Sequence, residues 1–426
     1  MNSREFVYNV LLLVEQQHIF VNDYLKDNHS FESFDIRDKS LAYKVIYGVI
    51  QNKLLLDYQI DQFLKNPTKL SIKARIILRI VAYQSIFLDT IPAHANCSTA
   101  VNSAKKLKLG KLAGLINAIS RKLVKVNYNN IILPNKSNLV YYLSIKYSHP
   151  KWLINRWLKH RGKQDTIATL EKNNETLPTT IRINPKKISL ELIRELLEEK
   201  GYEVSTVELT PQLALNVDKG SVFKTDLFEN GLITIQDQGA IKACLLLDLD
   251  KGQRILDMCS APGGKTALIG NLLDNQGEII AIDINKNKLK LVDEICKRMG
   301  VIAKTIQADA TSINENEFGL FDRIILDAPC SGLGTLRTKP EVRWYRNMKD
   351  IIESVPLQIK LLANGLKLLK ENGILVYVTC SNEIEETDEV IRARQDIEIL
   401  KSLQLYPFKF NTEGFYIAVI KKKGIN

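Results

Sequence analysis

The chain has 426 residues, of which 45% are hydrophobic and 25% are charged. It is too long for one ordinary core, because domains commonly hold ~100–200 residues, and its composition excludes a globally disordered protein. No apolar run approaches the ~18 residues that a membrane span needs, so we expect no membrane partner. The apolar stretch 6–14 leads into Glu15 without a small-residue cleavage site, which favours an amphipathic helix over a signal peptide.

The six cysteines are scattered, with no C-x-x-C pair and no histidine at metal-ligand spacing. This pattern predicts neither a disulfide framework nor a metal site, and it favours the reducing cytoplasm. The formal net charge of +11 is concentrated, since residues 61–130 hold twelve Lys/Arg and only two Asp. Such a segment indicates phosphate binding, although a solvated helical surface is the plainer alternative.

Residues 1–130 show the pattern of an all-α domain. Apolar positions recur at helical spacing in 41–50 and 76–87, and Pro67 and Pro92 stand between periodic segments. No run of alternating apolar residues indicates a sheet here. Residues 131–168 then predict a helical connection, which Pro134 and Pro150 punctuate.

The pattern changes after residue 168. Residues 169–230 predict a small α+β domain, with strands at 180–184 and 202–209 and a helix at 190–200. From 231 to 426, short apolar strands alternate with helices, which predicts a doubly wound α/β domain with a parallel sheet. The predicted strands are 254–258, 278–282, 303–307, 321–326 and 374–378, and the predicted helices are 266–273, 286–299 and 350–370.

Ligands of open parallel sheets bind beyond the carboxyl ends of the strands. After the first predicted strand comes a loop with Pro262-Gly263-Gly264, which lets the backbone approach a ligand just before a helix. Asp283 follows the second strand and can accept hydrogen bonds from a ribose diol, and Asp309 follows the third. Together these residues indicate an adenosyl ligand.

Three nucleotide ligands compete for this loop. A phosphate-binding P-loop needs glycine where Cys259 stands, so that reading fails. A dinucleotide loop needs G-x-G-x-x-G, whereas this loop has glycine only at 263 and 264. S-adenosylmethionine carries no phosphate and suits a loop with fewer glycines, so the pattern favours it over NAD.

Cys330 and Cys380 lie just past two strand ends that we expect to be neighbours. All five histidines precede the sheet domain, which excludes a histidine base within it. A thiolate that attacks carbon 6 of a pyrimidine needs no such base and makes carbon 5 nucleophilic, while Asp327 would hydrogen bond the base. A free cysteine is more often a small buried hydrophobe, and we expect that role for Cys97, Cys244 and Cys296.

Three strings of the sheet domain resemble motifs I, IV and VI of the RNA 5-methylcytosine methyltransferase (NOP2/Sun) family. They are D-M-C-S-A-P-G-G-K-T at 257–266, D-A-P-C-S-G-L-G-T at 327–335 and V-T-C-S at 378–381. The stretches 340–344 and 414–416 are similar to later parts of the same family. The amino half resembles the NusB-type RNA-binding domain at 37–38, 47–49, 91–95 and 114–118, and 181–184 with 236–237 resembles the family's small domain.

The resemblance implies a Rossmann-like S-adenosylmethionine methyltransferase domain behind a NusB-like domain and a small α+β domain. It implies that Cys380 is the nucleophile, that Cys330 assists product release and that Asp327 polarises the base; spacing alone does not rank the two thiols. It also implies the cofactor contacts Cys259, Ser260, Ala261, Pro262, Gly263, Gly264, Lys265, Asp283, Asp309 and Asp327. One departure stands at 384–387, where the family commonly has P-E-E-N and this chain has I-E-E-T.

The NusB-like half implies the branch of the family that methylates carbon 5 of a cytosine in 16S ribosomal RNA, naked or in an early particle. We expect a cytoplasmic monomer. The alternatives are the same chemistry on tRNA or 23S rRNA, and a non-catalytic NusB-type assembly factor, which the intact strand-end residues disfavour. The candidate RNA contacts are Lys105, Lys106, Lys108, Lys111, Arg121, Lys122, Arg182 and Arg337.

Overall fold

A computed structural model describes residues 3–26, 28–88, 91–223 and 225–423. It divides into two compact units. Unit 1 holds residues 1–175 together with the short segment 339–345, and unit 2 holds 176–338 and 346–426. No helix among the described residues is both long and apolar enough to cross a membrane.

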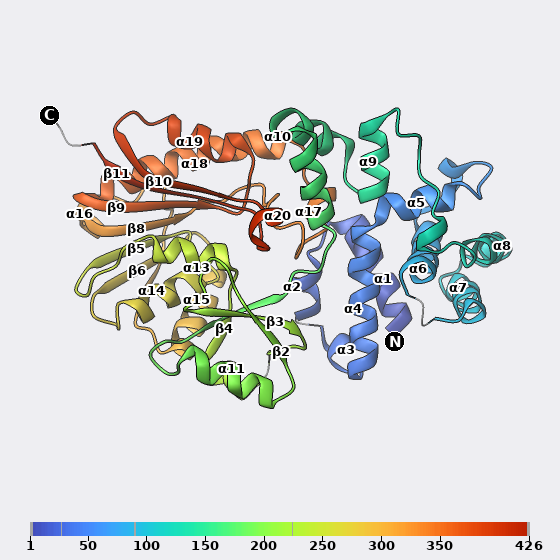
Figure 1. Cartoon of the computed structure of the whole chain (residues 1–426), viewed down its shortest axis with the longest axis horizontal. Helices are drawn as coiled ribbons and strands as arrows, with labels where there is room; N and C mark the ends of the chain where they lie inside the picture. The colour runs from blue at the N-terminus through green and yellow to red at the C-terminus, as the bar shows by residue number, and fades with distance from the viewer. Residues whose placement is uncertain (1–2, 27, 89–90, 224, 424–426) are drawn as a thin grey trace. The chain divides into compact units, whose positions relative to one another are not determined.

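Unit 1 is helical, which confirms the all-α prediction for its first part (Figure 1). Its core joins side chains from the amphipathic faces of successive helices, such as Phe6, Ile46 and Ile76. Asp35 and Ser71 cap two of these helices by accepting hydrogen bonds from backbone N–H groups of the first turn. The helices are α1 (Ser3–Gln17), α2 (Val21–Lys26), α3 (His29–Glu32), α4 (Ile36–Gln51), α5 (Lys53–Asp61), α6 (Ile72–Phe87), α7 (Ala93–Lys106), α8 (Ala113–Leu123), α9 (Leu139–Tyr147) and α10 (Lys151–Lys172).

The segment 339–345 belongs to the core of unit 1, although its sequence neighbours belong to unit 2. Its short helix α17 (Val342–Tyr345) carries Arg343, which is fully buried. The guanidinium of Arg343 donates to the carbonyls of Ser148 (3.2 Å) and Asn173 (3.3 Å), and Trp344 Nε1 donates to the Ile50 carbonyl (2.8 Å). The chain therefore leaves unit 2 after Thr338 and returns to it at Arg346, which the sequence analysis did not foresee.

Unit 2 contains two sheets. The smaller has the order β2-β3-β1-β4 and is antiparallel, with α11 (Leu190–Glu199) packed on β2. Strands β3 and β4 were not predicted, and the sequence placed only the first two strands of this α+β unit. Its strands are β1 (Thr179–Ile183), β2 (Glu203–Thr206), β3 (Ala214–Lys219) and β4 (Ile233–Ile235).

The larger sheet has seven strands in the order β10-β11-β9-β8-β5-β6-β7. The five predicted strands pair in parallel, which confirms the doubly wound fold, and β11 adds an antiparallel connection between β9 and β10. Strand β10 was not predicted, because its exposed, partly charged sequence is that of a sheet edge. The strands are β5 (Arg254–Met258), β6 (Glu278–Asp283), β7 (Lys304–Gln307), β8 (Phe321–Asp327), β9 (Leu369–Thr379), β10 (Ile397–Leu405) and β11 (Phe415–Lys422).

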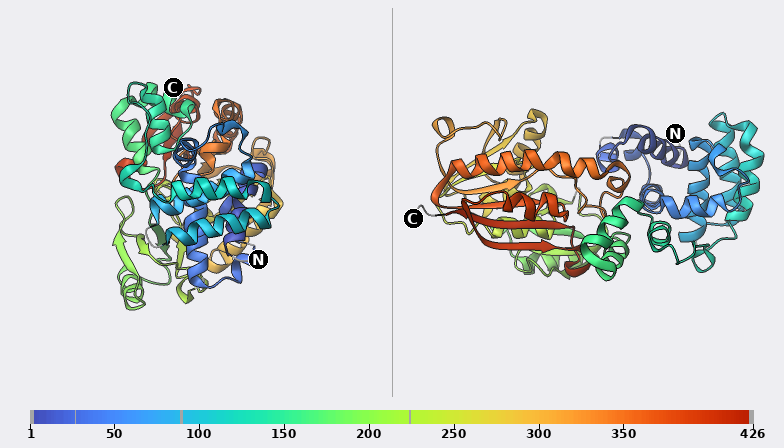
Figure 2. Two further views of the ribbon diagram at one scale, coloured as in Figure 1. Left: turned by 90° about the vertical axis from the view of Figure 1, so that its right-hand side faces the viewer. Right: turned by 90° about the horizontal axis from the view of Figure 1, so that it is seen from above.

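Helices cover both faces of this sheet, so its central strands are buried on both sides (Figures 1 and 2). Successive residues of β5 alternate between two cores, with Ile255 in one and Leu256 in the other. The helices of the first core are α13 (Gln238–Leu245), α14 (Gly264–Leu272) and α15 (Lys286–Met299), and those of the second are α18 (Met348–Leu368) and α19 (Asp388–Arg392). The loops at the carboxyl ends of the strands remain available for a site.

Helix α14 packs too closely at Gly270 to accept a side chain. A Cβ added there would lie 2.2 Å from Cγ1 of Val301. We therefore expect Gly270→Ala to lower the free energy of unfolding by about 1–3 kcal/mol, because overpacking outweighs the gain in helix propensity of up to ~1 kcal/mol. Chemical denaturation measures this loss.

The double variant Gly270→Ala/Val301→Ala is the matched control, since it removes the two methyl groups that the new Cβ would meet. It should be more stable than the sum of the two single changes predicts. Strict additivity would contradict the packing described for α14.

Candidate active site

The loop between β5 and α14 is held in one shape by its backbone. Cys259 has a positive φ of 60°, and the Ser260 N–H donates to the Ile282 carbonyl (2.9 Å). Gly263 has a φ of 106°, and a Cβ there would lie 2.7 Å from Cα of Val292 in α15. Only glycine fits that position. Burial raises the pKa of the Cys259 thiol to about 12, so its backbone conformation rather than its sulfur shapes the loop.

Predicted site residues from three further strand ends surround this loop. Lys265 Nζ donates to Asp327 Oδ2 at 2.5 Å, which joins the first turn of α14 to the end of β8. Asp283 accepts hydrogen bonds from the N–H groups of Asn285 (2.9 Å) and Ala261 (3.3 Å). Asp309 accepts from the N–H and hydroxyl of Thr311, which hold the pKa of this exposed carboxyl below its usual range.

Two buried polar atoms beside the loop lack protein partners within the described part of the chain. They are Oδ1 of Asp257 and Oγ of Ser260. The other oxygen of Asp257 accepts from the Thr266 hydroxyl at 2.6 Å. Buried polar atoms are normally hydrogen-bonded, so these two, together with the glycine backbone and the three carboxylates, fit a polar adenosyl ligand.

The two cysteines singled out by the sequence lie together. Cys330 follows β8 and Cys380 follows β9, and these strands are parallel neighbours. Their sulfur atoms are 3.4 Å apart, and both residues are partly exposed. The hydrogen bond to Cys380, together with burial, raises the pKa of the Cys330 thiol well above its usual value. Cys330 therefore holds its proton more tightly than a free cysteine does, and its thiol can donate to the Cys380 sulfur.

The loops that carry these thiols are bonded to each other through Gly334. Its N–H donates to the Cys380 carbonyl (2.9 Å), and its own carbonyl accepts from the Gly414 N–H (2.8 Å). A Cβ at Gly334 would lie 2.1 Å from the Gly414 carbonyl oxygen. Glycine at this position therefore sets the distance between the two thiol-bearing loops.

Six of the predicted RNA contacts are exposed on neighbouring elements of unit 1. Helices α7 and α8 pack side by side and carry most of them (Figure 2). Lys106 forms an ion pair with Glu5 (2.5 Å), and Lys122 lies over the ring of Phe63 (5.7 Å). The exposed residues are Lys105, Lys106, Lys108, Lys111, Arg121 and Lys122.

The other two predicted RNA contacts are wrong, because both side chains are buried. Arg182 is 0% exposed and donates to Gln236 Oε1 (2.7 Å) and Asn271 Oδ1 (3.3 Å), so it joins β1 to α14. Arg337 is 7% exposed and donates to Asn411 Oδ1 and the Thr176 carbonyl, both at 3.1 Å. Their guanidinium groups support the fold and do not face solvent.

Part of the basic excess in residues 61–130 is also neutralised within unit 1. Arg79 is 4% exposed and forms ion pairs with Glu15 and Asp57, both at 2.7 Å. Arg75 pairs with Asp61 at 2.9 Å. The positive charge left for other partners is therefore smaller than the sequence suggested, and six of its cations lie between residues 105 and 122, on α7, α8 and the turn between them.

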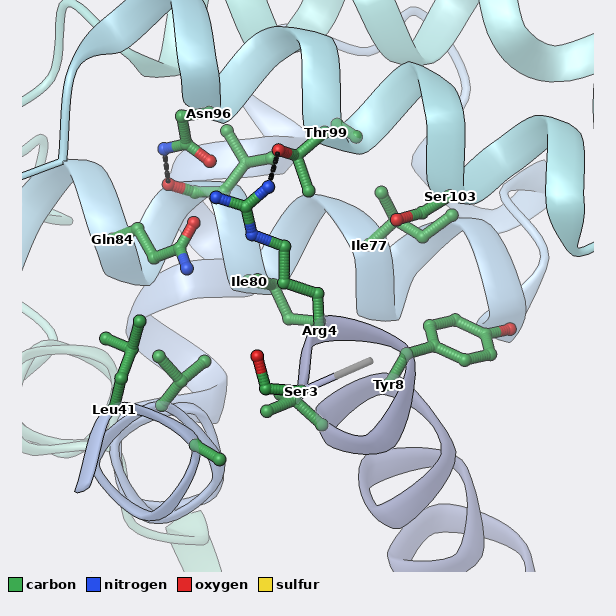
Figure 3. Close-up of a pocket in the computed structure, with 15 residues that line it drawn as sticks. Ser3, Arg4, Tyr8, Leu41, Ile77, Ile80, Gln84, Asn96, Thr99 and Ser103 are labelled. Carbon is green, nitrogen blue, oxygen red and sulfur yellow. Dashed lines mark hydrogen bonds between the residues drawn. The ribbon is translucent and has the colours of Figure 1, made fainter. Parts of the chain in front are cut away.

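A separate hollow in unit 1 lies between α1, α4, α6 and α7 (Figure 3). Its lining is mainly apolar, and at its mouth Arg4 donates to the Thr99 hydroxyl at 2.9 Å. None of the site residues predicted from the sequence lines it.

Family comparisons agree with this geometry. Residues 244–421 match the family described as 16S rRNA methyltransferase RsmB/F, residues 1–125 match the NusB family, and residues 149–222 match the RsmF/B-like ferredoxin-like domain. A probable ribosomal RNA small subunit methyltransferase B of Bacillus subtilis is 30% identical over 99% of both chains. The chain belongs to the RsmB family.

Further comparisons support the same RsmB-family assignment. The ribosomal RNA small subunit methyltransferase B of Proteus mirabilis is 30% identical over 91% of both chains. A methyltransferase homologue from Pyrococcus horikoshii has a solved structure with 31% identity and a TM-score of 0.60, covering 67% of this chain and 99% of that one. The resemblance seen in motifs I, IV and VI is thereby confirmed at the level of the family and its domains.

The sequence analysis missed two acidic residues of this RsmB-family site. Asp257 was quoted only as the first letter of motif I, yet its side chain is buried beside the glycine loop. Glu386 stood in the departing stretch 384–387 and was given no role, yet its carboxylate contacts the loops of both cysteines. An acidic residue within the apolar strand 254–258 was the available signal for Asp257, whereas the polar stretch around Glu386 gave none.

The buried carboxyl of Asp257 should make the stability of the fold depend on pH. Burial raises its pKa from 3.8 to about 7. The folded state therefore keeps a proton that the unfolded state releases, and stability falls as pH rises from about 4 to 7, by about 4 kcal/mol at most. Asp257→Asn cannot ionise, so its unfolding temperature relative to the unmodified protein should rise between about pH 4 and pH 7 and level off above that.

Thermal unfolding at several pH values measures this difference. Asp248→Asn is the matched control, since Asp248 is exposed in the same unit. Equal pH dependence of the Asp257 variant and the unmodified protein would show that Asp257 is ionised in the fold throughout this range.

Proposed function

We propose that this RsmB-family chain transfers a methyl group from S-adenosylmethionine to carbon 5 of a cytosine in 16S ribosomal RNA, through a covalent bond between Cys380 and the RNA. The observation that carries the proposal is the 3.4 Å approach of the Cys330 and Cys380 sulfur atoms at neighbouring strand ends. The names of the relatives support the small-subunit rRNA as substrate, naked or in an early particle.

The cofactor would lie on the glycine loop and the acidic strand ends. The backbone from Cys259 to Gly264 would approach it closely, and Asp283 would accept hydrogen bonds from its ribose hydroxyls. Asp309 and the Lys265–Asp327 pair would border it at the ends of β7 and β8. When bound, S-adenosylmethionine supplies an electrophilic methyl group on a sulfonium centre.

The Cys380 thiolate would form a bond to carbon 6 of the cytosine. The electron pair displaced from the ring would make carbon 5 nucleophilic, and carbon 5 would bond the methyl group as the methyl–sulfonium bond breaks and leaves a neutral thioether. The carbon 5 proton would then pass to water, and its bonding pair would restore the ring and expel Cys380 as a thiolate. Asp327 would hydrogen bond the base during the addition.

Cys330 would act in the release step. Its raised pKa keeps it a thiol, and its S–H lies within hydrogen-bonding distance of the Cys380 sulfur, at 3.4 Å between the sulfur atoms. Donation to a departing thiolate stabilises the negative charge that develops when the covalent bond breaks. A hydrogen bond from Cys330 would thus make Cys380 a better leaving group.

The exposed cations of α7 and α8 would bind phosphates, whereas the site itself would select the base. Contacts to phosphate position an RNA without reading its sequence, and they weaken with added salt. The cytosine must leave its stack to reach Cys380, which costs a few kcal/mol and favours an unpaired base. The Lys and Arg side chains would offset that cost through binding.

The two cysteines give opposite predictions. Cys380→Ala should abolish methyl transfer and form no covalent RNA adduct, because no sulfur remains to attack carbon 6. Cys330→Ala should accumulate an adduct because release stalls, with turnover lowered ~100-fold or more. Denaturing gel electrophoresis of the protein with labelled RNA detects the adduct, and transfer of a labelled methyl group measures turnover.

Cys97→Ala is the control, because Cys97 lies on α7, in the unit that does not contain the two thiols. It should methylate normally and trap nothing. Normal turnover of Cys330→Ala without an adduct would contradict the roles assigned to the two thiols.

Bisulfite sequencing identifies the RNA. In a strain that lacks this chain, one cytosine of 16S rRNA should lose its protection from conversion, and Cys380→Ala should fail to restore it. Loss of protection in tRNA or 23S rRNA would redirect the same chemistry to that RNA. Unchanged protection in all three would favour a non-catalytic assembly factor.

A further inference from the structure

Glu386 lies where the two thiol-bearing loops meet. It ends the short helix η4 (Ile384–Glu386), which follows β9, and it is 0% exposed. Its Oε1 accepts from the Ser331 N–H (2.6 Å) and the Ser354 hydroxyl (2.7 Å). Its Oε2 accepts from the hydroxyls of Ser331 (2.6 Å) and Ser381 (2.5 Å). A carboxylate is the group that accepts four such short bonds.

The donors of these bonds come from three separate elements. Ser331 directly follows Cys330, Ser381 directly follows Cys380, and Ser354 belongs to α18. One side chain therefore joins the residue after each thiol and fixes both to the helix beneath them. Tyr377 strengthens the arrangement, because its hydroxyl donates to the Glu386 carbonyl at 2.9 Å.

Stability alone is a poor reason for this arrangement. The four donors to Glu386 that the structure describes are neutral groups, and a buried carboxylate without a cation costs free energy that neutral hydrogen bonds offset only partly. An amide side chain of similar size could accept some of the same bonds without the cost of burying a carboxylate. A carboxyl group at this point indicates a role beside the adjacent thiols.

We propose that the Glu386 carboxylate is a positioning residue that holds the Cys330 and Cys380 loops at the separation required for the methyl transfer proposed above. It does not touch the reacting atoms. It acts through Ser331 and Ser381, whose backbone carries each thiol, so a shift of either loop would change the distance between the sulfur atoms. The inference rests on the proposed function for its catalytic consequence, but its effect on the thiols is measurable without RNA.

The charge of Glu386 also bears on which thiol is protonated. A negative charge beside Cys330 disfavours its thiolate and adds to the effects of the Cys380 hydrogen bond and of burial on its pKa, while the Gly332 N–H acts in the opposite direction. The remaining groups around this loop are Tyr377 on β9, the Lys265–Asp327 pair after β8, and Arg346, which donates to the Ser331 carbonyl at 2.8 Å. Glu386 itself contacts both thiol-bearing loops, through Ser331 and Ser381.

The test uses Glu386→Gln in the full chain. Glutamine keeps the size, but its neutral amide would bond the three serines through longer and weaker hydrogen bonds than a carboxylate makes, which loosens the two thiol-bearing loops. We expect kcat for methyl transfer to fall about tenfold or more, with little change in KM for RNA, since a small misplacement of reacting groups is costly. The pH profile of Cys330 alkylation by iodoacetamide, followed by mass spectrometry of its peptide, should move to lower pH.

A shift of one pH unit would raise the alkylation rate of Cys330 about tenfold at a pH below its pKa. This readout separates a positioning role from a merely structural one, which would leave the profile in place. Glu353→Gln is the matched control, since it makes the same change at an exposed carboxylate of α18 that pairs with Lys349. It should keep kcat within about twofold of the unmodified protein.

If Glu386→Gln does not fold, Ser381→Ala replaces it, because that change removes the described bond between the Cys380 loop and the carboxylate. It should also lower kcat with little change in KM. A folded Glu386→Gln or Ser381→Ala variant with unchanged kcat, or an unmoved Cys330 profile in Glu386→Gln, overturns the inference. If the unmodified protein methylates no RNA, the proposed function fails, whereas a shifted alkylation profile would still support the link between Glu386 and the thiols.

Discussion

The parallel pairing of β8 with β9 is the constraint on which the site depends. In this register Asp327 lies opposite Val378, so the chain segments that leave the two strands start side by side. Cys330 and Cys380 follow within a few residues and reach a separation of 3.4 Å. Two further contacts hold the thiol-bearing loops together. Gly334 makes a backbone hydrogen bond to the Cys380 carbonyl, and Glu386 bonds the serine that follows each cysteine. The pairing of β8 with β9 brings the two cysteines near each other, and the loop contacts set the distance between their sulfur atoms.

Charge is distributed around this site in two layers. At the carboxyl ends of β6, β7 and β8, Asp283, Asp309 and Asp327 are at least partly exposed, and Lys265 balances one of them. Beneath them Asp257 is fully buried, and its pKa is raised to about 7 because no water solvates the charged form. Burial therefore raises the pKa of Asp257, whereas the bonds from Thr311 lower that of the exposed Asp309. The exposed layer can meet a polar ligand, while the buried one shapes the loop that carries it.

Sequence continuity does not define the units of this chain. Residues 339–345 directly follow the motif that carries Cys330, yet Arg343 and Trp344 bind carbonyl groups of unit 1. Arg182 illustrates the same effect within unit 2. A basic residue of the small ferredoxin-like domain is buried against α14, where Gln236 and Asn271 accept its hydrogen bonds. Arg182 and Arg343 are basic residues of a type common on binding surfaces, but both are buried in the core.

The sequence alone determined the helical amino half, the doubly wound sheet and the glycine loop, because apolar periodicity and turn chemistry are local properties of the chain. It also indicated Cys330 and Cys380, since residues at the carboxyl ends of parallel strands must share one edge of the sheet. It could not reveal the edge strand β10, the burial of Arg182 and Arg337, or the bonds of Glu386 to Ser331, Ser354 and Ser381. Those features depend on contacts between residues far apart in the chain, and only the packed structure decides which polar side chains lose water and which partners replace it.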